Sequence, residues 1–97
     1  METLSLNTVD KSHLYGIQYY QEDVLSTLNE RLARRKMLAK ALILGNIYKQ
    51  KVSLKFKNRQ NTLLSTEATV WAVTESYVIL KGHISIPIKS IIGIDIH

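Results

Sequence analysis

The sequence contains no cysteine. A chain without thiols cannot form a disulfide framework, use a thiolate as a nucleophile or bind zinc through sulfur. The absence of cysteine is also typical of proteins that work in a reducing compartment. We therefore expect the protein to be cytoplasmic.

Long apolar runs are also missing. No segment reaches the roughly 18 consecutive apolar residues of a membrane span, and the stretch from Met1 to Asp10 lacks the apolar core of a signal peptide. The chain has 97 residues, of which 45% are apolar, as is typical of one globular domain. These totals predict a single soluble domain over residues 1–97 without a membrane partner.

Residue clusters that support catalysis or metal binding are missing as well. His13, His83 and His97 are scattered along the chain, and none has a second histidine or a carboxylate at the spacing of a metal site. The chain contains no P-loop, dinucleotide-binding fingerprint or Gly-x-Ser-x-Gly motif. We therefore expect no cofactor, no metal and no enzymatic activity.

Acidic residues are missing from the middle of the chain, between Arg31 and Arg59. Because the whole chain has a net charge of +5, this stretch concentrates positive charge, and RNA or DNA is a candidate partner. The alternative is that the basic side chains keep an exposed sheet face soluble and protect its edge from aggregation. The basic residues of the stretch are Arg31, Arg34, Arg35, Lys36, Lys40, Lys49, Lys51, Lys55, Lys57 and Arg59.

The sequence has the periodicity of an amphipathic helix over residues 20–44. Apolar residues recur there on one stripe, which we expect to pack against the rest of the domain. Arg35 falls within the stripe, so either it pairs with a carboxylate at an interface or the helix is not fully covered. Gly45 and Asn46 predict the end of the helix. The stripe consists of Val24, Leu25, Leu28, Leu32, Ala39, Leu42 and Ile43.

Residues 1–19 are predicted to form an N-terminal arm. Leu4 and Leu6 alternate with polar residues, as in a short edge strand. Tyr15, Tyr19 and Tyr20 are expected to fix the arm to the barrel or to a second chain.

From residue 51 onward the sequence has the pattern of antiparallel strands. Runs of β-branched and aromatic residues are separated by small or polar residues. In the first run, Val52, Leu54 and Phe56 alternate with polar residues and are expected to face the core. A single helical turn is expected at 89–91. The predicted strands are 51–57, 62–74, 77–81, 84–88 and 92–96.

The segments VSLKF, SYVIL and IPIKSIIGI resemble the first, third and last two strands of the Sm-like group of SH3-type small barrels, which includes Hfq-like and YolD-like proteins. The resemblance implies an α+β fold in which an N-terminal helix precedes a five-stranded antiparallel SH3-like or Sm-like barrel over residues 51–96. It also implies RNA, ahead of DNA, as the partner. Sm-like proteins carry RNA-contacting motifs near the last turn. This chain has Pro87-Ile88-Lys89-Ser90 there instead, so no binding residue is carried over.

Basic residues along the strand 51–57 form the candidate nucleic-acid site. Their side chains alternate with those expected in the core, so they line one exposed face and can contact successive phosphates. A tyrosine at the preceding helix end can stack on a base. Such a site would bind by charge and with little preference for sequence. The candidate residues are Lys49, Lys51, Lys55, Lys57, Arg59 and Tyr48.

The alternative function is that of a protein-interaction module or regulatory adaptor with no nucleic-acid role. Its contact surface would be the helix or the tyrosines of the arm. The apolar stripe is large for so small a domain and contains Arg35, so we also expect a homo-oligomer, most simply a dimer. Binding that survives high salt would favour the adaptor, because apolar contacts are little screened.

Overall fold

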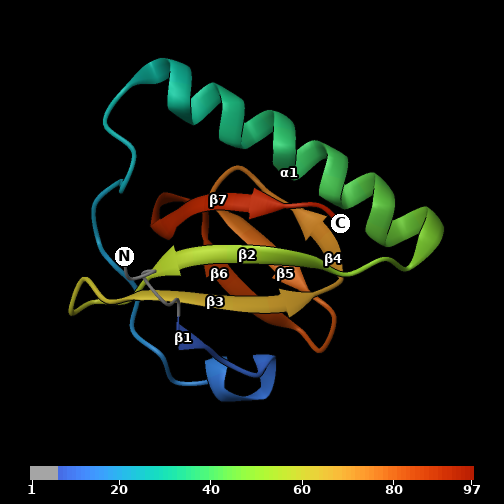
Figure 1. Ribbon diagram of the computed structural model, residues 1–97, viewed down its shortest axis with the longest axis horizontal. Helices are drawn as coiled ribbons and strands as arrows, with labels where there is room; N and C mark the ends of the chain where they lie inside the picture. Colours follow the sequence, from blue (N-terminus) through green and yellow to red (C-terminus); the bar gives the residue numbers. More distant parts are fainter. Residues whose placement is uncertain (1–6) are drawn as a thin grey trace, which may run out of the picture.

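Figure 1 shows the computed structural model, which describes residues 7–97. A two-residue strand, β1 (Asn7–Thr8), and a 3-10 turn, η1 (Lys11–Leu14), precede the helix α1 (Leu28–Tyr48). A second 3-10 turn, η2 (Ile88–Ser90), precedes the last strand. The remaining strands are β2 (Val52–Lys57), β3 (Leu63–Ala68), β4 (Val70–Val73), β5 (Tyr77–Leu80), β6 (Ile84–Pro87) and β7 (Ile91–Asp95). The edge strand predicted around Leu4 and Leu6 lies outside the described residues.

The strands form two sheets. In the first, β3, β2 and β7 are antiparallel neighbours, and β1 pairs parallel with β3. In the second, β4, β5 and β6 are antiparallel. Helix α1 packs against β7 and β4, which are edge strands of different sheets, so it bridges the two sheets. Within residues 7–97, no helix is long and apolar enough to cross a membrane.

The α+β class is confirmed, whereas the long second strand predicted over 62–74 is wrong. The segment is divided at Thr69 into β3 and β4, which belong to different sheets. Ala68, Thr69 and Val70 are all buried, although successive residues of one regular strand point to opposite faces. The chain therefore changes direction at Thr69, and the strands of residues 7–97 form two sheets rather than the predicted five-stranded closed barrel.

The boundaries of α1 also differ from the predicted 20–44. The helix begins at Leu28 because Thr27 caps it. The Thr27 hydroxyl accepts a hydrogen bond from the Glu30 N–H at 3.1 Å, and the Glu30 carboxylate accepts one from the Thr27 N–H at 3.2 Å. At the other end the helix passes through Gly45 and stops at Tyr48, where Lys49 adopts a left-handed conformation with φ 56°.

The buried face of α1 is not the predicted stripe. The buried residues of α1 are Arg34, Leu38, Ala41 and Gly45. Of the predicted stripe within α1, Leu42 packs partly against the core, whereas Leu28, Leu32, Ala39 and Ile43 are exposed. The cause is a steric one. A Cβ atom at Gly45 would collide with the carbonyl oxygen of Val70, so the backbone of α1 lies directly against β4. Only a face with small residues permits this approach, and that face is therefore buried.

The core lies between the two sheets. The side chains of Val52, Leu54 and Phe56 are fully buried, as their alternation predicts. They are enclosed by buried residues of β5 and β6, such as Val78 and Ile86.

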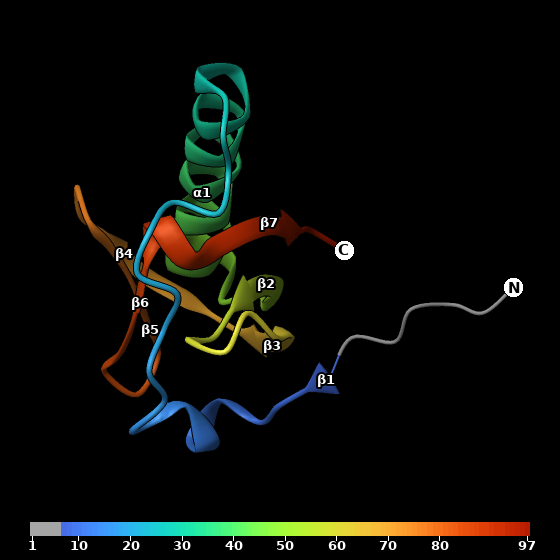
Figure 2. The same cartoon turned by 90° about the vertical axis from the view of Figure 1, so that its left-hand side faces the viewer.

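Residues 15–27 connect η1 to α1 and cross the side of the molecule that faces the viewer in Figure 2. The Tyr15 hydroxyl donates to the carbonyl oxygen of Gly82 at 2.8 Å. The Tyr19 ring packs on that of Phe56, with ring centres 5.6 Å apart, and burial raises the pKa of Tyr19 to about 12. Both tyrosines thus connect this segment to the sheets.

Replacing Gly45 with alanine is expected to lower the free energy of unfolding by about 1–3 kcal/mol, because the methyl group would push α1 away from Val70. Helix propensity alone would favour alanine by about 1 kcal/mol, so a net loss identifies the collision. Urea denaturation followed by circular dichroism measures the effect.

The matched control is Gly93→Ala in β7, where an added Cβ meets no atom within 4 Å. Its free energy of unfolding is expected to change by less than about 0.5 kcal/mol. A Gly45→Ala protein as stable as the parent would contradict the close approach of α1 to β4.

Candidate functional site

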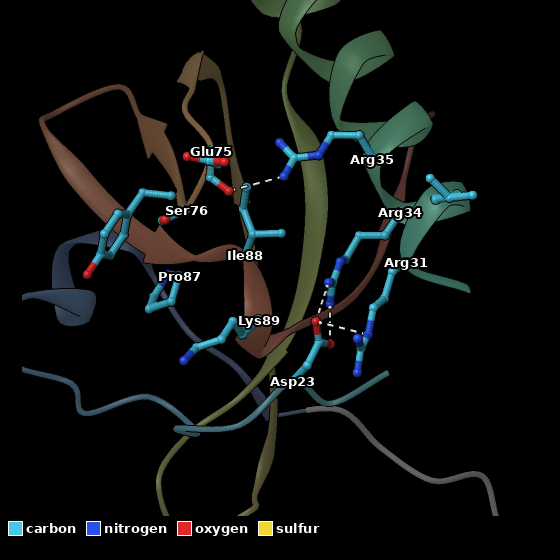
Figure 3. A pocket seen from close by; sticks show the side chains of 11 residues that line it. Asp23, Arg31, Arg34, Arg35, Glu75, Ser76, Pro87, Ile88 and Lys89 are labelled. Carbon is cyan, nitrogen blue, oxygen red and sulfur yellow. Dashed lines mark hydrogen bonds and ion pairs between the residues drawn. The ribbon is translucent and has the colours of Figure 1, made fainter. Parts of the chain in front are cut away.

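A cleft of about 540 Å³ lies between the N-terminal half of α1 and the segments around β5 and η2 (Figure 3). Four cations line it, three from α1 and one from η2, against two carboxylates, so its charge is positive. The cations are Arg31, Arg34, Arg35 and Lys89, and the carboxylates are Asp23 and Glu75. The other lining residues are Leu32, Ser76, Tyr77, Pro87 and Ile88.

Arg34 is the buried cation of the cleft, with only 7% of its surface exposed. Its two terminal nitrogens donate to the Asp23 carboxylate at 2.9 and 2.7 Å, and Nη1 also donates to the carbonyl oxygen of Ile91 at 2.9 Å. Arg31 shares the same carboxylate, with its Nε 3.3 Å from Oδ2. Asp23 therefore forms ion pairs with two arginines of α1, and Arg34 extends this connection from the segment before α1 to β7.

The environment of Asp23 holds its carboxyl group in the charged form. Burial by itself would raise the pKa of this group. The hydrogen bonds from Arg34 and from the Leu25 N–H, together with the charges of Arg34 and Arg31, outweigh burial and leave the pKa below the ordinary value of 3.8.

Arg35 closes the opposite wall of the cleft, where it reaches toward Glu75 (Figure 3). Its two terminal nitrogens donate to the backbone carbonyl oxygens of Thr74 and Glu75 at 3.2 and 3.1 Å. These partners are neutral. Within residues 7–97, neither Arg35 nor Lys89 forms an ion pair with a carboxylate, and both side chains are exposed. They are therefore the two exposed cations of the cleft that have no carboxylate partner among residues 7–97.

The lysines predicted to bind nucleic acid, Lys51, Lys55 and Lys57, lie along β2. Acidic side chains lie near Lys51 and Lys55. Lys55 forms an ion pair with Asp95 on β7, with Nζ and Oδ2 2.8 Å apart. Lys51 is exposed and borders a shallow depression that also contains Asp10 and Glu67. Lys57 is half-buried. The structure therefore places the three lysines in one row, but not as a surface of uniform charge.

The other three predicted residues lie beyond the ends of this row. Tyr48 is 67% exposed at the end of α1, next to Lys49, whose Nζ is 3.5 Å from the carbonyl oxygen of Asn46. Arg59 lies in the β2–β3 connection and donates to Oε1 of Gln18 at 2.9 Å. Tyr48 and Lys49 precede β2, and Arg59 follows it. Because β2 has six residues, Arg59 is separated from the other two by roughly 20 Å. The six residues are thus a row and not a pocket.

Sequence reasoning did not identify the cleft, although one signal pointed to it. Arg35 was the charged residue inside the predicted apolar stripe. Its presence there meant either that it pairs with a carboxylate at an interface or that the helix is not fully covered. It has no carboxylate partner among the described residues and lies on a part of α1 that the sheets do not cover. Nothing in the sequence indicated that Lys89 lines the cleft, because it does so only where η2 lies beside α1.

The histidines do not come together. His83 packs edge-on against Trp71, with ring centres 5.3 Å apart, and His97 lies 3.6 Å from the Glu67 carboxylate. His13 is exposed within η1. Within the part of the chain that the structure describes, no three histidine, aspartate or glutamate side chains gather in a way that could hold a metal ion.

Comparison of the chain with protein-family models, curated proteins and solved structures found no match. The function is therefore argued from the geometry of the cleft and of the surfaces around it.

Replacing Asp23 with asparagine is expected to lower the free energy of unfolding by about 3 kcal/mol at pH 7, because the buried Arg34 loses its counter-charge. The pH dependence changes as well. Since the pKa of Asp23 is lowered by folding, its contribution is complete above the unfolded value and is lost as the pH falls through the folded value.

Urea titrations between pH 7 and pH 2 measure both effects. The parent should lose stability steeply below about pH 4, and the Asp23→Asn protein should lose less over the same interval. Glu22→Gln, an exposed neighbour, is the control and should behave as the parent. Parallel pH curves for parent and Asp23→Asn would show that the ion pair does not stabilise the fold.

Proposed function

We propose that the protein is a non-enzymatic module that binds single-stranded nucleic acid, RNA ahead of DNA, in the cleft between α1 and η2. The observation that carries this proposal is the presence of two exposed cations, Arg35 and Lys89, without carboxylate partners among residues 7–97, at the edge of a cleft of about 540 Å³. Phosphate groups are the natural ligands of such a pair, and each neutralised phosphate releases counterions.

The cleft also offers surfaces for bases. Tyr77 is 46% exposed and borders the cleft together with Pro87 and Leu32. An aromatic ring beside cations is the usual arrangement for binding single strands, because a base stacks on the ring while its phosphate meets the charge. An arginine has five N–H donors, and the two carbonyl oxygens that Arg35 contacts leave donors for a phosphate.

The basic row of β2 adjoins the same end of the molecule. Phe56 pairs with Ile91, the residue after η2, so Lys57 lies at the end of β2 nearest the cleft. A strand bound in the cleft would extend onto this row and contact Lys57 and then Lys51. The row predicted from the sequence is thus proposed as an extension of the site.

The order of elements supports RNA as the ligand. The cleft includes Pro87, Ile88 and Lys89, at the turn where the Sm-like proteins that the chain resembles carry RNA-contacting motifs. Because those motifs are not matched, no side chain is assigned to read base edges, and binding is expected to depend little on sequence. In this proposal the protein acts by holding a strand, without chemistry.

The double substitution Arg35→Gln and Lys89→Gln removes the two cleft cations that have no carboxylate partner among residues 7–97. It is expected to weaken binding of a fluorescent RNA of about ten nucleotides by roughly tenfold at low salt. Fluorescence anisotropy measures the affinity. For the parent, a plot of log affinity against log salt should have a slope of roughly −2, as expected for about three phosphates on a single strand.

The matched control removes the same charge elsewhere, in Lys40→Gln with Lys81→Gln, and should bind as the parent does. The pair Lys51→Gln with Lys57→Gln tests the row and should have a smaller effect than the cleft pair. If the row variant loses most of the binding and the cleft variant none, the cleft is the wrong site. A parent that binds no RNA at low salt would contradict the function itself.

A second candidate function is protein interaction. The observation that favours it is the exposure of Ile43 and Ile47, one turn apart on the side of α1 that faces away from the sheets. Apolar side chains in such a row on a small domain are typical of a contact surface.

A further inference from the structure

The C-terminal half of α1 has an apolar flank beside the end of β7. Ile43 and Ile47, one turn apart, are 55% and 65% exposed. Next to Ile43 lies a groove of about 300 Å³ between the helix and the last residues of the chain, and its lining is mostly apolar. We call this area the helix–β7 surface. It consists of Lys36, Met37, Lys40, Ile43, Leu44, Ile47 and Ile96.

The charges on the helix–β7 surface are all positive. Lys36 and Lys40 are exposed and four residues apart, so they lie one above the other on the helix. Their spacing from Ile43 and Leu44 places them among the apolar side chains of the surface and not on the opposite side of the helix. The single acidic residue of α1 is Glu30, in the first turn, where it is engaged with Thr27.

We propose that the helix–β7 surface binds an amphipathic helix of another protein whose apolar stripe is flanked by aspartate or glutamate. This inference rests on the second candidate function and not on nucleic-acid binding. Carboxylates one turn apart on the partner would meet Lys36 and Lys40, which have the same spacing. Apolar side chains of the partner would cover Ile43 and enter the groove beside it, as in other helix-in-groove complexes.

Charge decides against a second copy of the chain as the occupant of this surface. Two copies joined through it would bring Lys36 and Lys40 of both chains together, and α1 supplies no free carboxylate to separate them. Like charges in an interface oppose association. The homo-oligomer that the sequence predicts would therefore have to use another surface.

The position of the lysines also decides against a lipid surface. A helix that lies in a bilayer interface carries its lysines beside a broad apolar face, from which they extend to the headgroups. On the helix–β7 surface, Lys36 and Lys40 instead lie between Ile43 on one side and the groove residues Met37 and Leu44 on the other. A partner helix with carboxylates at matching positions would form ion pairs with Lys36 and Lys40 while its apolar side chains cover their neighbours.

The test uses the full chain and two synthetic helical peptides with the same leucine stripe, one flanked by glutamate and the other by lysine. Isothermal titration calorimetry should detect micromolar binding of the glutamate peptide and at least tenfold weaker binding of the lysine peptide. Ile43→Ala should weaken binding of the glutamate peptide about fivefold or more. Lys36→Glu with Lys40→Glu should reverse the preference between the two peptides.

The matched control is Leu28→Ala, which removes an equally exposed apolar side chain at the other end of α1 and should leave the affinity unchanged. Circular dichroism confirms that each variant is folded. Because the substituted side chains are exposed, their loss should not unfold the protein.

Three results would overturn the proposal. The first is absence of binding of the glutamate peptide up to about 1 mM. The second is equal binding of both peptides, or binding that Ile43→Ala does not change. The third is an Ile43-dependent dimer in light scattering, or Ile43-dependent binding to vesicles of phosphatidylcholine and phosphatidylglycerol, which would assign the surface to a second copy or to a membrane. None of these results bears on RNA binding, because the cleft variants are different residues.

Discussion

The close approach of α1 to β4 at Gly45 is the constraint on which the other features depend. Because no side chain fits between Gly45 and the Val70 carbonyl oxygen, the rotation of the helix about its axis is fixed. That rotation directs Leu38 and Ala41 into the core and leaves Ile43 in solvent. The cleft and the helix–β7 surface, on opposite flanks of α1, both follow from this one contact.

The same rotation buries Arg34, and burial of a guanidinium group is costly unless its charge is paired. Asp23 supplies the charge and Ile91 a carbonyl oxygen, so most of the polar atoms of the buried arginine are satisfied. The pair thereby fixes the segment before α1 to the helix. The same interaction determines where this segment lies, and Asp23 and Arg34 line one wall of the cleft.

The charge of the molecule is divided between surfaces of different character. In the cleft, Arg35 and Lys89 lie near an exposed tyrosine and have no carboxylate partner among residues 7–97, an arrangement suited to phosphates and bases. On the helix–β7 surface, Lys36 and Lys40 lie among apolar side chains, an arrangement suited to an acidic helix. Lys55, by contrast, forms an ion pair with Asp95, so its charge is balanced within the chain. Equal charges thus have different surroundings, and the two proposed ligands differ for that reason.

The sequence by itself determined the α+β class, the inward face of β2 and the concentration of basic residues in the middle of the chain, since these follow from composition and from a local period of two. The capping box at Thr27 and Glu30 was not recognised in the sequence, so the helix was predicted to begin at residue 20 and not at Leu28. Only the tertiary structure decided which face of α1 is buried. Periodicity records the polarity of side chains, whereas the buried face was selected by size, through Gly45 against β4. The cleft could not be predicted either, because it joins residues from α1 and η2 that are far apart in the sequence and lie close together only in the folded chain.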